Sequence, residues 1–135
     1  MLIKDLNGNT HNWQLTGNMA KGKISTRSSL HLTTRSIITQ NYPTLQILEE
    51  VPIPLKNRET LYLDFYLPLK KTCIEVHGEQ HYKFVPFYHS TILNFLKSQK
   101  RDREKEEWCE LNNIKHVILR YDENEQTWNE RIKNA

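Results

Sequence analysis

The chain has 135 residues, of which 37% are hydrophobic and 10% aromatic, which suffices for one folded core and excludes wholesale disorder. Its net charge of +3 is only mildly basic, below what a domain that binds DNA by charge alone usually carries. No apolar run is long enough to span a membrane and no signal peptide is visible, so a cytoplasmic protein is expected. Cys73 and Cys109 are too few for a disulfide framework and are expected to be reduced core thiols.

Apolar periodicity and turn residues predict a mixed α/β (α+β) domain with a small N-terminal hairpin. Asn7-Gly8 favours a type I′ hairpin turn, and Trp13 is expected to attach this hairpin to the body. The expected elements in chain order are strands at 2–6 and 11–15, a connector at 17–23, a helix at 26–41, an edge strand at 45–55, strands within 63–68 and 73–81, a helix at 90–112, a strand at 114–121 and a helix at 125–133. We therefore predict a hairpin extension over residues 1–20 and a single domain over residues 21–135.

Two carboxylates lie inside the apolar strands at the centre of this pattern. Asp64 and Glu75 are eleven positions apart, and His77 and His81 follow closely. Charged side chains seldom lie inside such strands unless they are paired or bind a metal. For either acid alone, a solvent-facing position is the better interpretation. For both acids together with the histidines, a functional site is favoured.

The oxygen groups at this position suit a hard divalent cation. Asp64 and Glu75 would be the acidic ligands, and the carbonyl of Val76 would add a third oxygen. Such ligands favour Mg²⁺ or Mn²⁺ over Zn²⁺. The chemistry predicted for this set is metal-dependent hydrolysis of a phosphodiester.

Three further residues are candidates for handling protons. His81 is predicted to act as a general acid or base, because an ordinary histidine titrates near neutral pH. His77 either shares this role or only lines the site. Asp102, on the predicted long helix, would orient one of the two histidines, and its alternative is an ordinary surface salt bridge.

A basic segment and an aromatic segment are candidates for contacts with nucleic acid. The basic side chains that would contact phosphates are Lys21, Lys23, Arg27 and Arg35. The aromatic residues between Tyr82 and Tyr88 would stack on bases. The alternatives are a solvated surface for the basic segment and core capping for Phe84 and Phe87.

The order helix, three strands, helix, strand resembles the core of the PD-(D/E)xK nuclease superfamily. At three places the sequence also resembles the very-short-patch-repair endonucleases and related phage homing endonucleases. These places are Asp64 to Pro68, Ile74 to His81, and Arg101 to Arg103 followed by Asn113 and Tyr121-Asp122. The resemblance implies a restriction-endonuclease-like core and a Mg²⁺-dependent endonuclease that uses water as its nucleophile. It also implies double-stranded DNA as partner and a bacterial or phage-infected cell as the location. The sequence leaves open whether the protein is a monomer or a homodimer.

The chain departs from that superfamily at two positions. The superfamily lysine would fall two residues after Glu75, where His77 stands, so Lys100 or Lys105 would have to reach the site from the long helix. The acid of the first helix would fall near His31, which leaves its role to Glu49 or Glu50. Gln80 resembles a glutamine that related nucleases place near the metal.

Two other functions remain open on sequence alone. One is a DNA-binding module that keeps the fold without catalysis, against which the retained pair of Asp64 and Glu75 argues. The other is a ribonuclease of similar architecture, because nothing in the sequence distinguishes DNA from RNA.

Overall fold

The structure, a computed structural model, describes residues 1–15, 18–19 and 29–135 of the chain. Its strands and helices, in chain order, are β1 (Leu2–Lys4), β2 (Thr10–Asn12), β3 (Asn18–Met19), α1 (Ser29–Asn41), β4 (Leu48–Lys56), β5 (Glu59–Leu67), β6 (Thr72–His77), α2 (Pro86–His89), α3 (Ile92–Leu111), β7 (Lys115–Arg120) and α4 (Glu125–Lys133). Short 3₁₀ turns occupy Pro68–Lys70 and Glu79–His81. The predicted α+β class with an N-terminal hairpin is confirmed.

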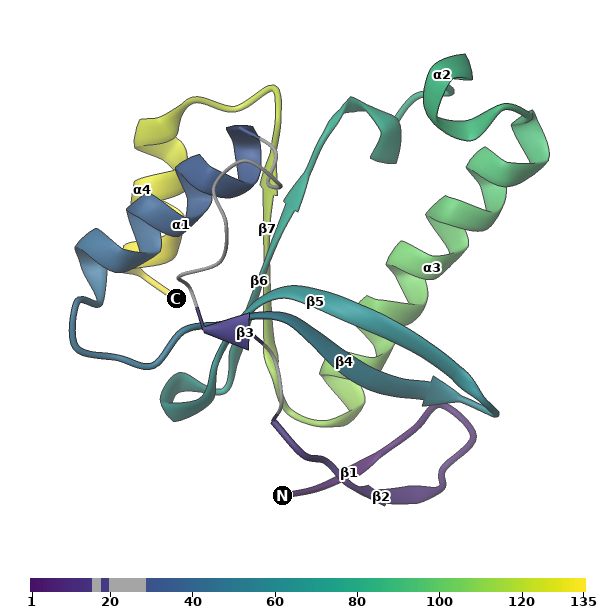
Figure 1. Ribbon diagram of the computed structural model, residues 1–135, viewed down its shortest axis with the longest axis horizontal. Helices are drawn as coiled ribbons and strands as arrows, with labels where there is room; N and C mark the ends of the chain where they lie inside the picture. The colour runs from purple at the N-terminus through teal and green to yellow at the C-terminus, as the bar shows by residue number, and fades with distance from the viewer. Residues whose placement is uncertain (16–17, 20–28) are drawn as a thin grey trace.

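One five-stranded sheet organises the protein, in the order β3-β4-β5-β6-β7. Neighbouring strands are antiparallel from β3 to β6, whereas β6 and β7 are parallel. Helix α3 makes the crossover between these two parallel strands, as parallel pairing requires. Figure 1 shows α1 and α4 side by side on one side of β6 and β7, with α3 on the other side.

Each face of the sheet has its own apolar core. Phe65 and Ile74 belong to the core under α1 and α4, whereas Tyr66 and Cys73 pack with Trp108 of α3. Successive side chains of a strand point to opposite faces. The alternation along β6 therefore directs residues 73, 75 and 77 toward α3. This parity decides which helix can reach Glu75.

The N-terminal hairpin forms as predicted, but its turn differs. The predicted two-residue type I′ turn is wrong, because residues 5–9 form a longer loop around one carboxylate. Asp5 accepts hydrogen bonds from the N–H groups of Asn7 (2.9 Å) and Asn9 (3.0 Å) through Oδ1. Trp13 attaches the hairpin to the body as expected: its ring is buried, and its indole N–H donates to the carbonyl of Pro52 at 2.9 Å.

Two further expectations are corrected, one by long-range strand pairing and one by a local helix cap. The predicted connector contains β3, which covers the first residues of β4, so β4 is not a complete edge strand. The long helix starts later than predicted, at Ile92, because Thr91 caps its N-terminus by accepting from the N–H of Asn94 at 3.1 Å.

Among the described residues, no helix combines the length and the apolar character needed to cross a bilayer.

Candidate active site

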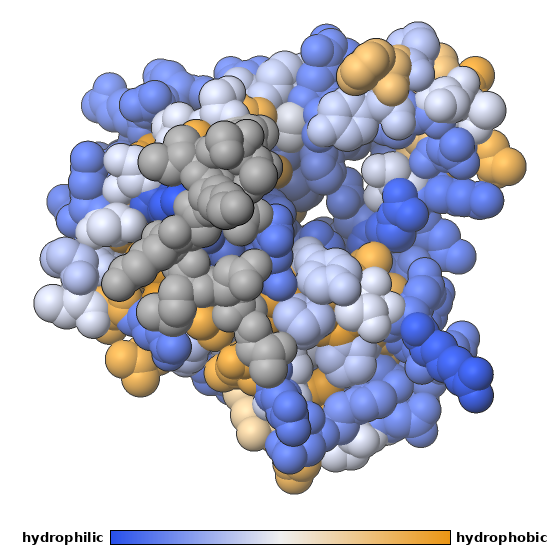
Figure 2. All heavy atoms as spheres, in the orientation of Figure 1, coloured by the Kyte–Doolittle hydropathy of each residue, from blue (hydrophilic) through white to orange (hydrophobic). Residues whose placement is uncertain are grey.

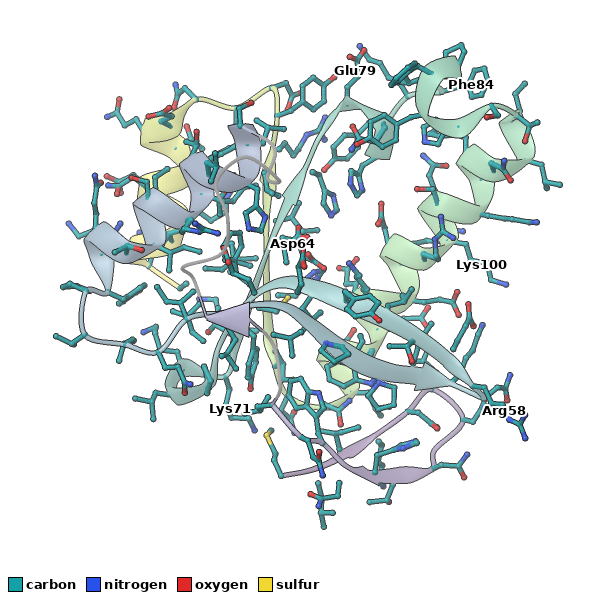
Figure 3. The ribbon with its side chains drawn as sticks, in the orientation of Figure 1. Arg58, Asp64, Lys71, Glu79, Phe84 and Lys100 are labelled. Atoms are coloured by element: carbon teal, nitrogen blue, oxygen red, sulfur yellow. The ribbon has the colours of Figure 1, made fainter. Side chains whose placement is uncertain are left out.

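Strands β5 and β6 separate at Asp64, and the two carboxylates lie at the point of separation. The last pair of the ladder between these strands is Phe65 with Ile74. One residue further, the N–H of Asp64 donates to Oε2 of Glu75 at 2.9 Å. In return, the N–H of Val76 donates to Oδ2 of Asp64 at 3.0 Å. The acids thus replace the carbonyl acceptors of the ladder, and Figure 3 shows Asp64 where β5 crosses β6.

The carbonyl of Val76 points to the same opening. The N–H and C=O groups of one strand residue lie on the same edge of the strand. The N–H of Val76 is directed to Asp64, whereas the carbonyl of the next residue, His77, accepts from Tyr121 at 2.9 Å on the β7 side. The structure therefore brings together the three oxygen groups that the sequence singles out, from Asp64, Glu75 and Val76.

Lys105 of α3 completes this charged group. Its Nζ lies 2.9 Å from Oε1 of Glu75, which is only 1% exposed. Burial alone would raise the pKa of Glu75, but the charge of Lys105 and hydrogen bonds from Asp64 and Lys105 outweigh it and lower the pKa to about 2. Burial and the charge of Glu75 raise the pKa of Asp64 well above its ordinary value. The acids therefore form an unfavourable pair that a second cation would relieve.

Of the two lysines considered from sequence, only Lys105 reaches the acids. Lys100 is exposed on the outer side of α3, away from Asp64 (Figure 3). Asp102, Lys105 and Cys109 lie three and four residues apart and so share the face of α3 that meets the sheet. Apolar residues by themselves do not mark this face, because Ile92 is 64% exposed.

The two histidines lie against each other next to the acids. Their rings stack with centroids 4.1 Å apart and planes 3° apart. Nδ1 of His81 lies 2.8 Å from Oδ2 of Asp102, and Nδ1 of His77 lies 3.1 Å from the hydroxyl of Tyr82. Burial, with a smaller contribution from the neighbouring His81, lowers the pKa of His77 to about 4, so this ring is neutral at physiological pH. Of the two histidines that Asp102 was predicted to orient, it contacts His81.

The histidine pair opens into a pocket of about 250 Å³ between the end of β6 and α3. It is lined by His77, His81, Tyr82, Gln99, Asp102, Arg103, Glu106 and Ile118. Figure 2 shows the molecule hollowed in this region. A second hollow of about 420 Å³ shares His81 and includes Gln80 and Arg101, so His81 stands between two accessible spaces.

Glu49, the candidate replacement for the acid of the first helix, lies away from the paired carboxylates. Glu49 of β4 lies toward α1, where its Oε1 is 2.9 Å from Nε2 of His31. Arg35 donates to both oxygens of Glu49, at 2.8 and 2.9 Å. Glu49 therefore lies on the face opposite to Lys105 and does not join the pair of Asp64 and Glu75.

The predicted contacts with nucleic acid are placed only in part. Arg35 is engaged with Glu49, and the other three basic residues, Lys21, Lys23 and Arg27, lie outside the described residues. Phe87 is 96% exposed and so does not cap the core, in contrast to the alternative considered for it. Phe84 packs edge-on against Phe95 of α3, with ring centroids 6.5 Å apart.

One participant was not identified from the sequence. Tyr82 appeared only as part of an aromatic segment, yet its hydroxyl contacts His77 and its ring lies 4.0 Å from the guanidinium carbon of Arg120. The available signal was its place directly after His81, in the turn that closes the pocket.

No protein-family profile matches the chain, and no solved structure matches it significantly. A stretch of 61 residues is 38% identical to "Uncharacterized protein 307L" of Invertebrate iridescent virus 6. That stretch is 45% of this chain and 31% of the viral protein, so the chain matches less than a third of its relative's length. The name of the relative states no activity.

Proposed function

We propose that the protein is a Mg²⁺- or Mn²⁺-dependent DNA endonuclease with a restriction-endonuclease-like core. The observation that carries this proposal is the pairing of Asp64 and Glu75 at the opening between β5 and β6, with Lys105 on Glu75. A buried carboxylate, a half-buried one and a lysine in contact are costly to fold. Such a cost is expected where the residues bind a cation and a phosphate.

The donor groups fit a hard cation. Asp64, Glu75 and the carbonyl of Val76 would hold it, and all three offer oxygen, as Mg²⁺ prefers. The raised pKa of Asp64 supports this assignment, because a cation would relieve the repulsion between the acids. When bound, Mg²⁺ stabilises charge on a phosphate and lowers the pKa of a bound water.

Lys105 takes the role that the superfamily gives to a lysine two residues after the strand acid. It keeps Glu75 ionised. Burial alone would lower the pKa of Lys105, but the charges of Glu75 and Asp64 outweigh this effect and raise the pKa, so the ammonium stays protonated. In this position Lys105 donates to a phosphate oxygen as negative charge develops in the transition state.

His81 and Asp102 move the proton. The contact between Nδ1 and Asp102 holds the proton on Nδ1 and leaves Nε2 of His81 as the acceptor. Nε2 takes a proton from the attacking water or returns it to the leaving oxygen. His77, neutral and stacked beneath, supports the ring of His81.

Double-stranded DNA is the proposed partner, on the strength of the sequence resemblance. Lys21, Lys23 and Arg27 are proposed to contact phosphates, whereas the contacts of Arg35 favour a role in holding Glu49. The exposed ring of Phe87 is free to stack on a base. A cytoplasmic location in a bacterial or phage-infected cell remains part of this proposal.

Incubation with supercoiled plasmid, with and without Mg²⁺, tests the activity. We expect nicked or linear product only with the metal, and none from Asp64→Asn or Glu75→Gln. Glu107→Gln, on the exposed side of α3, is the matched control and should cleave normally. A folded wild-type protein that leaves both plasmid and a matching RNA intact with Mg²⁺ and Mn²⁺ refutes the proposal. Cleavage of the RNA alone would identify a ribonuclease instead.

A further inference from the structure

A second group of metal-ligating side chains lies directly behind Glu75. The side chain of Cys73 precedes it on the same face of β6, and His116 is the register partner of Cys73 on β7. One ligand atom from each of Cys73, Glu75 and His116 lies within 4.8 Å of the other two. These are sulfur, oxygen and nitrogen donors, unlike the all-oxygen set of the candidate active site.

His116 has an unused ring nitrogen in this group. Its Nε2 atom is buried and has no hydrogen-bond partner among the described residues. A buried polar atom without a partner costs about 1–3 kcal/mol and is uncommon in folded proteins. This unpartnered Nε2 is therefore available to a cation.

Cys109 of α3 is the candidate for a fourth ligand, and its Sγ lies outside the group of atoms within 4.8 Å that Cys73, Glu75 and His116 form. Its thiol lies within hydrogen-bonding reach of the thiol of Cys73, and both cysteines are buried and unpaired by a disulfide. Two thiols, one imidazole and one carboxylate make a four-ligand set of the kind that binds Zn²⁺ tetrahedrally.

We propose that Cys73, Cys109, His116 and Glu75 form a buried site for a thiophilic divalent cation such as Zn²⁺. Binding deprotonates both thiols, so one Zn²⁺ enters and two protons leave. The net charge of the buried group is therefore unchanged, and the pair of Glu75 with Lys105 already balances itself. An ion can then enter this core without the large cost of uncompensated buried charge.

Occupation of this site would regulate the proposed nuclease, and this part of the inference depends on the proposed function. Glu75 belongs to both ligand sets. A Zn²⁺ ion that shares this carboxylate would weaken its hold on a cation at Asp64. We therefore expect Zn²⁺ to inhibit cleavage that Mg²⁺ supports, and Cys73→Ser to relieve this inhibition.

Titration of the full chain with Co²⁺ under reducing conditions tests the site without reference to activity. We expect one equivalent to produce a thiolate-to-cobalt charge-transfer band and the intense visible bands of tetrahedral Co²⁺, both displaced by Zn²⁺. Cys73→Ser should weaken the charge-transfer band, because one of the two thiolates is lost, and His116→Gln, at a half-buried position, should weaken binding while retaining the apo fold by circular dichroism. Absence of the charge-transfer band in the wild type, or an undiminished band in Cys73→Ser, overturns the proposal.

Proton release provides a second measurement. Calorimetry in buffers of different ionisation enthalpy should show about two protons released per ion, so the affinity rises up to about 100-fold per pH unit below the thiol pKa values. Cys109→Ser should release about one proton. Release of fewer than two protons by the wild type contradicts the pair of thiolates. Asp64→Asn separates the two proposals: it should lose cleavage yet keep the cobalt spectrum, and a wild type that never cleaves refutes only the nuclease.

Discussion

Replacement of Lys105 should expose how strongly Glu75 depends on it. Lys105→Met keeps most of the side-chain volume and removes the charge 2.9 Å from Oε1 of Glu75. The pKa of Glu75 is lowered from 4.5 to about 2, and each unit corresponds to about 1.36 kcal/mol, so the favourable environment is worth about 3 kcal/mol. Loss of one partner of a buried pair costs about 3–5 kcal/mol, which agrees. We expect Lys105→Met to lower the free energy of unfolding by about 3 kcal/mol at pH 7.

The pH dependence of this loss identifies its cause. The folded-state pKa of Glu75 lies below its unfolded value, so its contribution to stability is complete above about pH 4.5 and disappears as the pH falls toward 2. The pKa of Lys105 is raised, so its contribution is complete below its unfolded value of 10.5 and is lost as the pH rises above it. The difference between variant and wild type should therefore be largest between these limits and shrink toward pH 2.

Urea denaturation followed by tryptophan fluorescence measures this difference, because Trp108 and Trp128 are buried in the two cores. Lys100→Met on the same helix is the control: its exposed side chain should contribute less than about 0.5 kcal/mol. Equal stability of the two variants, or a difference that does not change with pH, would refute the assignment of Lys105 as the partner of Glu75.

Four further predictions concern other residues of the chain. Asp64→Asn should raise the urea midpoint at neutral pH, because the raised pKa of Asp64 means that its ionised form opposes folding above pH 3.8; an unchanged midpoint would contradict this. His81→Ala should slow cleavage about 10² to 10⁴-fold in single-turnover assays, and an unchanged rate would leave this residue a structural role only. Arg35→Ala should lower the melting temperature by removing the cation that donates to both oxygens of the buried Glu49 carboxylate, and a fully stable variant would argue against the buried ion pair. The other three basic residues are Lys21, Lys23 and Arg27. Neutralising them should reduce the slope of log DNA affinity against log salt concentration by up to about three, whereas an unchanged slope would place DNA on another surface.

Local sequence signals were sufficient for most of the elements. The closing helix spans Glu125–Lys133 as predicted, since Asn124 caps it and an apolar stripe ends in Ile132. Asp64 and Glu75 could be singled out because an acid inside an apolar strand is costly wherever the strand packs. These inferences succeed because they depend on residues that are neighbours in the chain.

The partners of the charged residues were decided only by the tertiary structure. Lys100 and Lys105 look alike in the sequence, and the phase of α3 against the sheet brings one to Glu75 and turns the other to solvent. The burial of Glu49 likewise converts Arg35 from a candidate phosphate contact into half of an ion pair. Composition and periodicity by themselves determined which side chains are costly to bury and which elements carry them. Their pairing depends on strand parity and helix phase across long separations, because a charge inside the core is stable only where a distant segment supplies its counterpart.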